Sequence, residues 1–154
     1  MSNNFFKDLK LGEYYEKKLL DYIPYETYEK IDGCFKYYDL IIYKKNGQKT
    51  TYEVKSDRLM KNTGNICIEY KYKNNLSGIS TTTAKYWAIF EIKDNFDTLY
   101  KIPTKIIREF IRDKRYTRDC KGGDFKASDL YLFDKTLFEN FIIFQKKKNK
   151  NKKL

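Results

Sequence analysis

The stretch Tyr38–Ser56 decides the fold of this chain, and it reads YDLIIYKKNGQKTTYEVKS. Aromatic and β-branched residues favour a strand over Cys34–Tyr43 and a second strand over Thr50–Ser56. The Lys45-Asn46-Gly47 segment between them has the composition of a tight turn. We therefore predict a β-hairpin here.

The register of this hairpin decides which side chains share a face. Residues two apart in a strand share a face, so Glu53 and Lys55 point together and Val54 points into the opposite layer. A strict two-residue turn would place Asp39 across from Val54, on the wrong face. A three-residue loop with a left-handed Gly47, or a β-bulge, would place Asp39 directly opposite Glu53. We predict one of these two arrangements.

In that register two carboxylates converge from neighbouring strands, with a lysine two residues beyond one of them. Like charges repel, and a divalent cation relieves the repulsion between Asp39 and Glu53. Oxygen ligands suit Mg²⁺, with Mn²⁺ as a possible substitute. Such an ion can stabilise charge that develops on a phosphate, and Lys55 can orient the attacking water.

The rest of the sequence predicts an α/β protein. Apolar spacing predicts an amphipathic helix over Leu9–Ile23, ended by Pro24, with Glu13 and Glu16 one turn apart. The later elements that we expect are a strand over Asn65–Tyr72, a short helix within Ser80–Tyr86, strands over Trp87–Ile92 and Thr98–Ile102, a helix from Pro103 to about Lys114, a loop over Lys121–Asp124, and apolar elements over Leu130–Phe133 and Leu137–Phe144. This order indicates a sandwich with a mixed central sheet.

Composition limits the chemistry that the chain can perform. The 154 residues fit one domain, which we place at 1–144, and the net charge is +11. Because the sequence contains no histidine, histidine-dependent triads and zinc sites with histidine ligands are excluded. Residues 145–154 carry six lysines and no acid, so we expect a disordered tail.

The basic charge favours an anionic partner, nucleic acid before membrane. No apolar run approaches the ~20 residues that span a bilayer, and the first residues lack the pattern of a signal peptide. We therefore expect an intracellular protein that is not secreted and has no membrane partner.

Asp39, followed after thirteen residues by Glu53-Val54-Lys55 and preceded by a helix with Glu16, resembles the PD-(D/E)xK nuclease superfamily. The resemblance covers roughly residues 10–93 and implies a restriction-endonuclease-like core, a mixed central β-sheet flanked by helices. It also implies that Asp39, Glu53, the Val54 carbonyl and Glu16 hold the catalytic metal, while Lys55 assists the attacking water. The helix resembles that of junction-resolving and phage-type members, which favours Glu16 over Glu13.

Two features depart from this pattern or compete with it. Tyr38 stands where the name-giving proline would be, at a position that does not bind metal. A second Glu-x-Lys, Glu69-Tyr70-Lys71, is a rival site, but it lacks an apolar strand ending in Asp at a hairpin's distance upstream. We therefore rank it below Glu53-Val54-Lys55.

The resemblance extends to segments that would contact DNA. Asn65–Tyr70 and Ser77–Trp87 are similar to strings in small phage and large-virus nucleases, and we expect the polar residues in and before these segments to meet phosphates. The residues concerned are Arg58, Lys61, Asn65, Ser77, Thr82 and Lys85.

These observations predict a Mg²⁺-dependent DNA endonuclease that acts in recombination, repair or viral DNA processing, with a Holliday junction resolvase as one form. Its partner would be double-stranded or branched DNA, and the family analogy allows a homodimer. The alternative is a non-catalytic, basic nucleic-acid-binding protein that keeps the fold and uses charge alone.

Overall fold

The hairpin predicted from Tyr38–Ser56 lies within a six-stranded mixed sheet in the computed structural model, which describes residues 3–31, 33 and 37–144. The strand order is β1-β2-β3-β6-β7-β10. β3 and β6 run parallel, whereas the other neighbours in this sheet are antiparallel. The bounds are β1 Thr27–Lys30, β2 Leu40–Tyr43, β3 Lys49–Asp57, β6 Tyr86–Glu91, β7 Thr98–Pro103 and β10 Ile142–Ile143.

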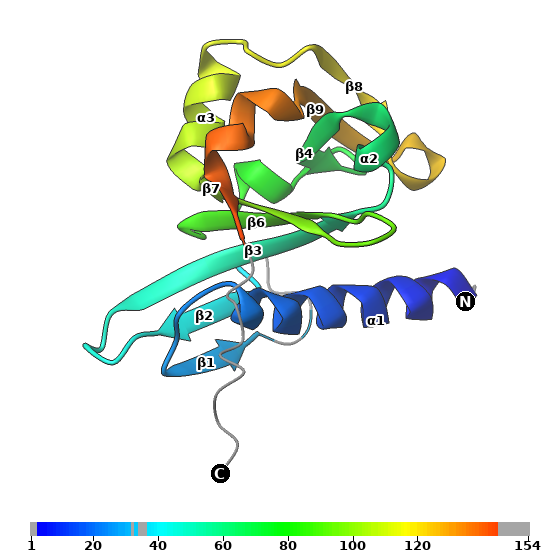
Figure 1. Ribbon diagram of the computed structural model, residues 1–154. Coiled ribbons are helices and arrows are strands. Elements are labelled where there is room, and N and C mark those ends of the chain that lie inside the picture. Colours follow the sequence, from blue (N-terminus) through cyan, green and yellow to red (C-terminus); the bar gives the residue numbers. More distant parts are fainter. Residues whose placement is uncertain (1–2, 32, 34–36, 145–154) are drawn as a thin grey trace.

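A second sheet of four antiparallel strands has the order β5-β4-β9-β8. Its strands are β4 Asn65–Tyr72, β5 Asn75–Leu76, β8 Arg118–Gly122 and β9 Ser128–Asp134. The helices are α1 Asn3–Lys18, α2 Met60–Thr63 and α3 Thr104–Arg112, and the 3₁₀ turns are η1 Leu19–Asp21, η2 Gly78–Ser80, η3 Asp124–Lys126 and η4 Lys135–Phe141. The second sheet and α3 lie on one side of the six-stranded sheet, and α1 lies on the other (Figure 1).

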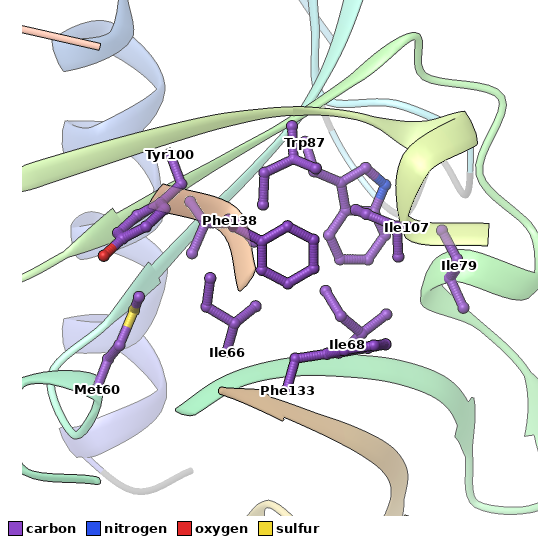
Figure 2. Close-up of a cluster of buried hydrophobic side chains, with 11 residues drawn as sticks. Met60, Ile66, Ile68, Ile79, Trp87, Tyr100, Ile107, Phe133 and Phe138 are labelled. Atoms are coloured by element: carbon purple, nitrogen blue, oxygen red, sulfur yellow. The ribbon is translucent and has the colours of Figure 1, made fainter. Parts of the chain in front are cut away.

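Strand β6 separates two hydrophobic cores because its side chains alternate between the faces of the sheet. Trp87 and Ile89 pack with residues of the second sheet, α3 and η4 (Figure 2). Ala88 and Phe90 pack with Tyr15 and other residues of α1 and η1. β6 is therefore buried on both faces, which explains its nearly continuous apolar sequence.

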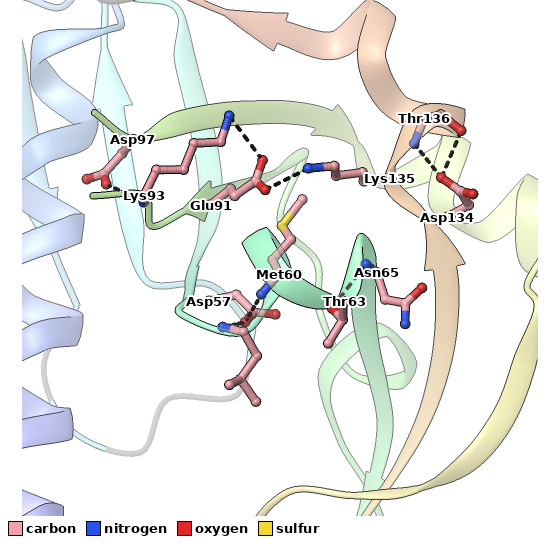
Figure 3. A network of polar contacts seen from close by, with 11 residues as sticks. Asp57, Met60, Thr63, Asn65, Glu91, Lys93, Asp97, Asp134, Lys135 and Thr136 are labelled. Carbon is pink, nitrogen blue, oxygen red and sulfur yellow. Dashed lines mark hydrogen bonds and ion pairs between the residues drawn. The ribbon is translucent and has the colours of Figure 1, made fainter. Parts of the chain in front are cut away.

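One carboxylate is fully buried at the end of β6. Glu91 has no solvent exposure, and its Oε2 accepts a hydrogen bond from Lys135 Nζ at 2.8 Å. Lys93 Nζ lies 3.7 Å from its Oε1 (Figure 3). In the same region Asp57 accepts hydrogen bonds from the backbone N–H groups of Leu59 and Met60 at the start of α2. Lys135 and Lys93 compensate the charge of Glu91, which would otherwise be too costly to bury.

Several predicted elements are confirmed with small shifts at their ends. A helix covers most of Leu9–Ile23, although α1 starts earlier and ends at Lys18 before η1. The strands expected at Thr50–Ser56, Trp87–Ile92 and Thr98–Ile102 and the helix after Pro103 are present, and the apolar element at Leu130–Phe133 lies within strand β9. Strand β2 starts only at Leu40, and residues 34–36 of the longer strand that we expected lie outside the described residues.

Other predicted elements are wrong or were missed. Lys121 and Gly122 belong to β8 rather than to a loop, and β1 was not expected. Leu137–Phe144 divides into η4 and β10. The tail predicted at 145–154 lies outside the described residues.

The mixed central sheet is confirmed, but its third predicted strand belongs elsewhere. Asn65–Tyr72 forms β4 with the predicted bounds, yet β4 lies in the second sheet and pairs with β9. In β4, Ile66 and Ile68 are buried while Cys67 between them is exposed, a pattern that suits a strand with one face on the core. The strand that pairs with β3 in the six-stranded sheet, on the side away from β2, is instead β6, which is buried on both faces.

The short helix expected within Ser80–Tyr86 is absent from that segment. η2 ends at Ser80, and the chain then runs irregularly to β6. Thr82 donates from its hydroxyl to the Tyr37 carbonyl at 2.9 Å, and the N–H groups of Thr83 and Ala84 bond to the same carbonyl. The Ala84 N–H also bonds to the Thr82 hydroxyl at 3.1 Å, and such bonds from threonine side chains compete with helix formation.

Candidate active site

The loop of the hairpin has three residues, as one of the two predicted arrangements requires. The Lys44 N–H donates to the Gln48 carbonyl and the Gly47 N–H donates to the Lys44 carbonyl, both at 2.9 Å. Gly47 is left-handed, with φ of +79°. Since Leu40 then pairs with Tyr52, the register that directs Asp39 toward Glu53 is confirmed.

Asp39 lies one residue before the paired part of β2. Its backbone N–H donates to the Tyr52 carbonyl at 2.9 Å, and its Oδ2 accepts from the Val54 N–H at 2.8 Å. The carboxylate thus takes the place of a backbone acceptor at the end of the ladder. This bond holds the acid against the backbone that joins Glu53 to Lys55.

Glu53 and Lys55 form an ion pair on the face of β3 turned toward the second sheet. Lys55 Nζ lies 3.1 Å from Glu53 Oε1, and only 12% of the Glu53 side chain is exposed. Both residues line a pocket of about 310 Å³ with residues of β4, β5 and η2. Val54 packs on the opposite side with the core beneath α1, as the alternation predicts.

More acidic than basic side chains influence this pocket. Burial raises the pKa of Glu53 against the opposing effect of Lys55, and the nearby Asp39 and Glu69 raise it further. Burial would lower the pKa of Lys55, but Glu53, Asp39 and Glu69 raise it above its usual value. A protonated lysine therefore faces several acids.

Glu69, taken from the sequence as part of a rival site, is a neighbour of the Glu53–Lys55 pair. Its carboxylate accepts from Ser77 Oγ at 3.1 Å and from Ser128 Oγ at 2.5 Å. A Cβ at Gly78 would lie 2.2 Å from the Glu69 carbonyl oxygen, so glycine is required at this wall of the pocket. The sequence gives no signal for this neighbourhood because it depends on how η2 packs on β4.

A second pocket of about 200 Å³ lies beside α1 and is lined by Glu13, Glu16, Lys30 and Asp39, among others. Lys30 Nζ is 3.5 Å from Glu16 Oε2 and 3.7 Å from Glu13 Oε1. Burial and the neighbouring Asp39 raise the pKa of Glu16, which Lys30 opposes. Glu16 is also the less exposed of the two helical acids, so it is the one that interacts with Asp39. Lys30 was not predicted as a member of the site.

The four proposed catalytic residues therefore lie in two adjoining pockets, with Asp39 influencing both. Within 3–31, 33 and 37–144 no three acids, cysteines or histidines are grouped closely enough to hold a metal ion. The donor chemistry nevertheless suits a hard divalent cation. Glu16 Oε2 is buried without a hydrogen-bond partner among the described residues, and repulsion from Asp39 acts on Glu16 and on Glu53.

The residues expected to contact DNA are spread over several surfaces. Ser77 lines the pocket of Glu53 and Lys55. Lys61 pairs with Asp94 at 2.8 Å, on the wall of a different pocket.

Arg58 is exposed after β3, and Asn65 starts β4. Thr82 is 3% exposed and bonds inside the protein, so its hydroxyl is not at the surface. Lys85 lines a fourth pocket, with residues of the core beneath α1.

Comparison of the chain with protein-family models, with curated proteins and with solved structures gave no match in any of the three. Among the helices of the described residues, none has both the length and the apolar character needed to cross a membrane.

Proposed function

We propose that this protein is a divalent-metal-dependent DNA endonuclease that hydrolyses phosphodiester bonds at the pocket of Glu53 and Lys55. The observation that carries the proposal is the contact of Asp39 with the backbone of the Glu53-Val54-Lys55 strand. Asp39 immediately precedes β2 and is bonded to the β3 backbone that carries Glu53 and Lys55, which supports the arrangement that the family resemblance implies. A six-stranded mixed sheet with α1 on one face is compatible with a restriction-endonuclease-like core.

Asp39, Glu53, the Val54 carbonyl and Glu16 are the groups that would hold Mg²⁺ or Mn²⁺. The ion supplies positive charge that stabilises a phosphate during in-line attack. Lys55, whose raised pKa keeps it protonated at neutral pH, donates to the attacking water or to the phosphate oxygens. Ser77, on the wall of the same pocket, is placed to donate to a neighbouring phosphate.

The proposal requires two ion pairs to open when the metal binds. Lys55 would turn from Glu53 toward substrate, and Glu16 would leave Lys30. The Lys55 side chain is 48% exposed and the Glu53 partner lies at the pocket wall, so this exchange is local. Because a bound metal ion would replace each lysine as the positive charge beside its acid, the largely buried carboxylates of Glu53 and Glu16 would stay compensated.

To test this proposal, the purified protein is incubated with supercoiled, linear and four-way-junction DNA, either in Mg²⁺ or in EDTA. We expect nicking or cutting in Mg²⁺, and a loss of roughly 100-fold or more in Asp39→Asn and Lys55→Ala. Lys49→Ala removes the same charge from an exposed position of the same strand and should keep activity. Full activity in Lys55→Ala or Asp39→Asn would reject this site.

One observation favours the alternative, a basic protein that binds nucleic acid without cutting it. Lys55 and Lys30 already neutralise Glu53 and Glu16 inside the structure. In that case DNA binding would fall steeply with salt, as contact with phosphates alone requires, and would not need a divalent metal. No cleavage in any divalent metal, with retained binding, would support this reading.

A further inference from the structure

Three lysines converge on a small pocket on the α1 side of the six-stranded sheet, away from Glu53 and Lys55. Lys44 follows β2, Lys85 precedes β6, and Lys101 lies on β7. The pocket has a volume of about 90 Å³, roughly the space of three waters. Its volume suits one compact ligand group rather than a nucleotide base.

Tyrosine rings fix the position of two of the lysines. Lys101 Nζ lies 4.3 Å from the centroid of the Tyr86 ring, and Lys85 Nζ lies 5.6 Å from it. Tyr86 in turn stacks on the buried Tyr52 at 5.5 Å between centroids. Because the ammonium groups of Lys85 and Lys101 both lie over Tyr86, they are held near one another.

The positive charge of this pocket is not balanced by the protein. Its lining residues include no acid, and within the described part of the chain none of the three lysines has a carboxylate within 4.0 Å. Burial lowers the pKa of Lys101, and repulsion from Lys44 and Lys85 lowers it further. The buried Thr50 hydroxyl also lines the pocket and adds a neutral donor.

We propose that this three-lysine pocket, formed by Lys44, Lys85 and Lys101, is a binding site for a single phosphate group. A tetrahedral dianion offers several acceptor oxygens, which match the ammonium groups and the Thr50 hydroxyl. Free phosphate and a phosphate of a nucleic acid share this chemistry. The site goes beyond the proposed cleavage activity, since it needs neither a metal ion nor the Glu53 pocket.

To test this proposal, inorganic phosphate is titrated into the protein in EDTA at constant ionic strength. NMR follows the lysine Cε and Nζ signals. Phosphate should shift the signals of the three lysines and raise the pKa of Lys101. Lys101→Met, which keeps the apolar stem, and Lys85→Ala should each weaken phosphate binding roughly tenfold or more. Lys105→Ala, an exposed lysine on α3, should leave the affinity unchanged.

A second arm identifies the source of the phosphate. If a short single-stranded oligonucleotide displaces inorganic phosphate from the wild-type protein, the pocket accepts a nucleic-acid phosphate; if it does not, the ligand is free phosphate. Either result supports the site. Phosphate affinity that is the same in Lys101→Met and in the wild type, or acetate binding as strong as phosphate binding, would overturn it. Because the assay contains no divalent metal, failure of the nuclease proposal would leave its result unaffected.

Discussion

The Val54 N–H donates to Asp39 Oδ2 at 2.8 Å, so an acid from one strand is bonded to the backbone of the next. The bond places Asp39 where it influences both Glu53 and Glu16, although these two acids line different pockets. Asp39 therefore couples the ionisation of Glu53 in one pocket to the ionisation of Glu16 in the other.

Replacing Asp39 should change the ionisation of acids in both pockets. In Asp39→Asn we expect the pKa values of Glu16 and Glu53 to fall toward 4.5, because the repulsive charge is gone. NMR titration of the side-chain carboxyl carbons measures both values in one experiment. Asp94→Asn, at an 86%-exposed position, is the control and should change neither value.

The same pKa shifts set the sign of a pH effect on stability. A carboxyl whose pKa is higher in the folded state binds more protons folded than unfolded, so the free energy of unfolding falls as pH rises through that window. For Glu16 and Glu53 the window begins near 4.5 and extends to their raised values. Urea unfolding at several pH values should therefore show a smaller decline over this window in Asp39→Asn than in the wild type. Equal slopes would contradict the coupling.

The hairpin loop should be sensitive to loss of its glycine. Gly47→Ala forces a side chain into a left-handed backbone and should lower the free energy of unfolding by about 1 kcal/mol. Gly12→Ala is the matched control, because Gly12 lies within α1 and an added Cβ there meets nothing within 4 Å. That change should raise stability by about 0.5–1 kcal/mol. Urea denaturation measures both, and a stabilising Gly47→Ala would contradict the observed loop.

Gly78 should tolerate replacement less well than any glycine in an open turn. In Gly78→Ala the new methyl would collide with the Glu69 carbonyl, so we expect a loss of about 2–3 kcal/mol or more. Gly64→Ala has the same left-handed strain but open space around it, and it should cost about 1 kcal/mol. The difference between their unfolding midpoints in urea isolates the collision from the backbone strain. Equal losses would place η2 farther from β4 than the structure does.

The buried Glu91 should be one of the costliest acids to remove. Glu91→Ala removes the fully buried carboxylate and leaves Lys135, which is 30% exposed, without its partner, so it should destabilise the protein by about 1–3 kcal/mol. A double-mutant cycle with Lys135→Met measures the coupling between the two residues. The exposed pair Lys61–Asp94 provides the contrast, with a coupling below about 1 kcal/mol. Similar coupling energies for the two pairs would contradict the burial of Glu91.

Local patterns predicted much of the fold. Apolar periodicity indicated α1 and α3, and the apolar run at Trp87 indicated β6, because these signals lie within a few consecutive residues. The left-handed glycine of the loop was one of the alternatives that the sequence left open, and it fixed the face of Asp39. By contrast, β1 and β8 are polar and mostly exposed, so no periodic signal marks them.

The features of the fold and of the candidate site that the sequence did not predict depend on contacts between distant segments. Nothing local distinguishes a strand of the first sheet from one of the second, so the sequence did not indicate that Asn65–Tyr72 would form a separate sheet with β9. Lys30 approaches Glu16 through the pairing of β1 with β2, and Glu69 approaches Glu53 through the packing of the two sheets. Thr82, expected at a DNA surface, is instead used to hold the irregular segment before β6.

The position of β6 between the two cores has a consequence for how the molecule melts. Because neighbouring residues of one strand belong to opposite cores, neither half can lose its packing without disturbing the other. We therefore expect one cooperative transition rather than two steps. Trp87 is the sole tryptophan of the chain, so its fluorescence would follow that collapse for the whole structure.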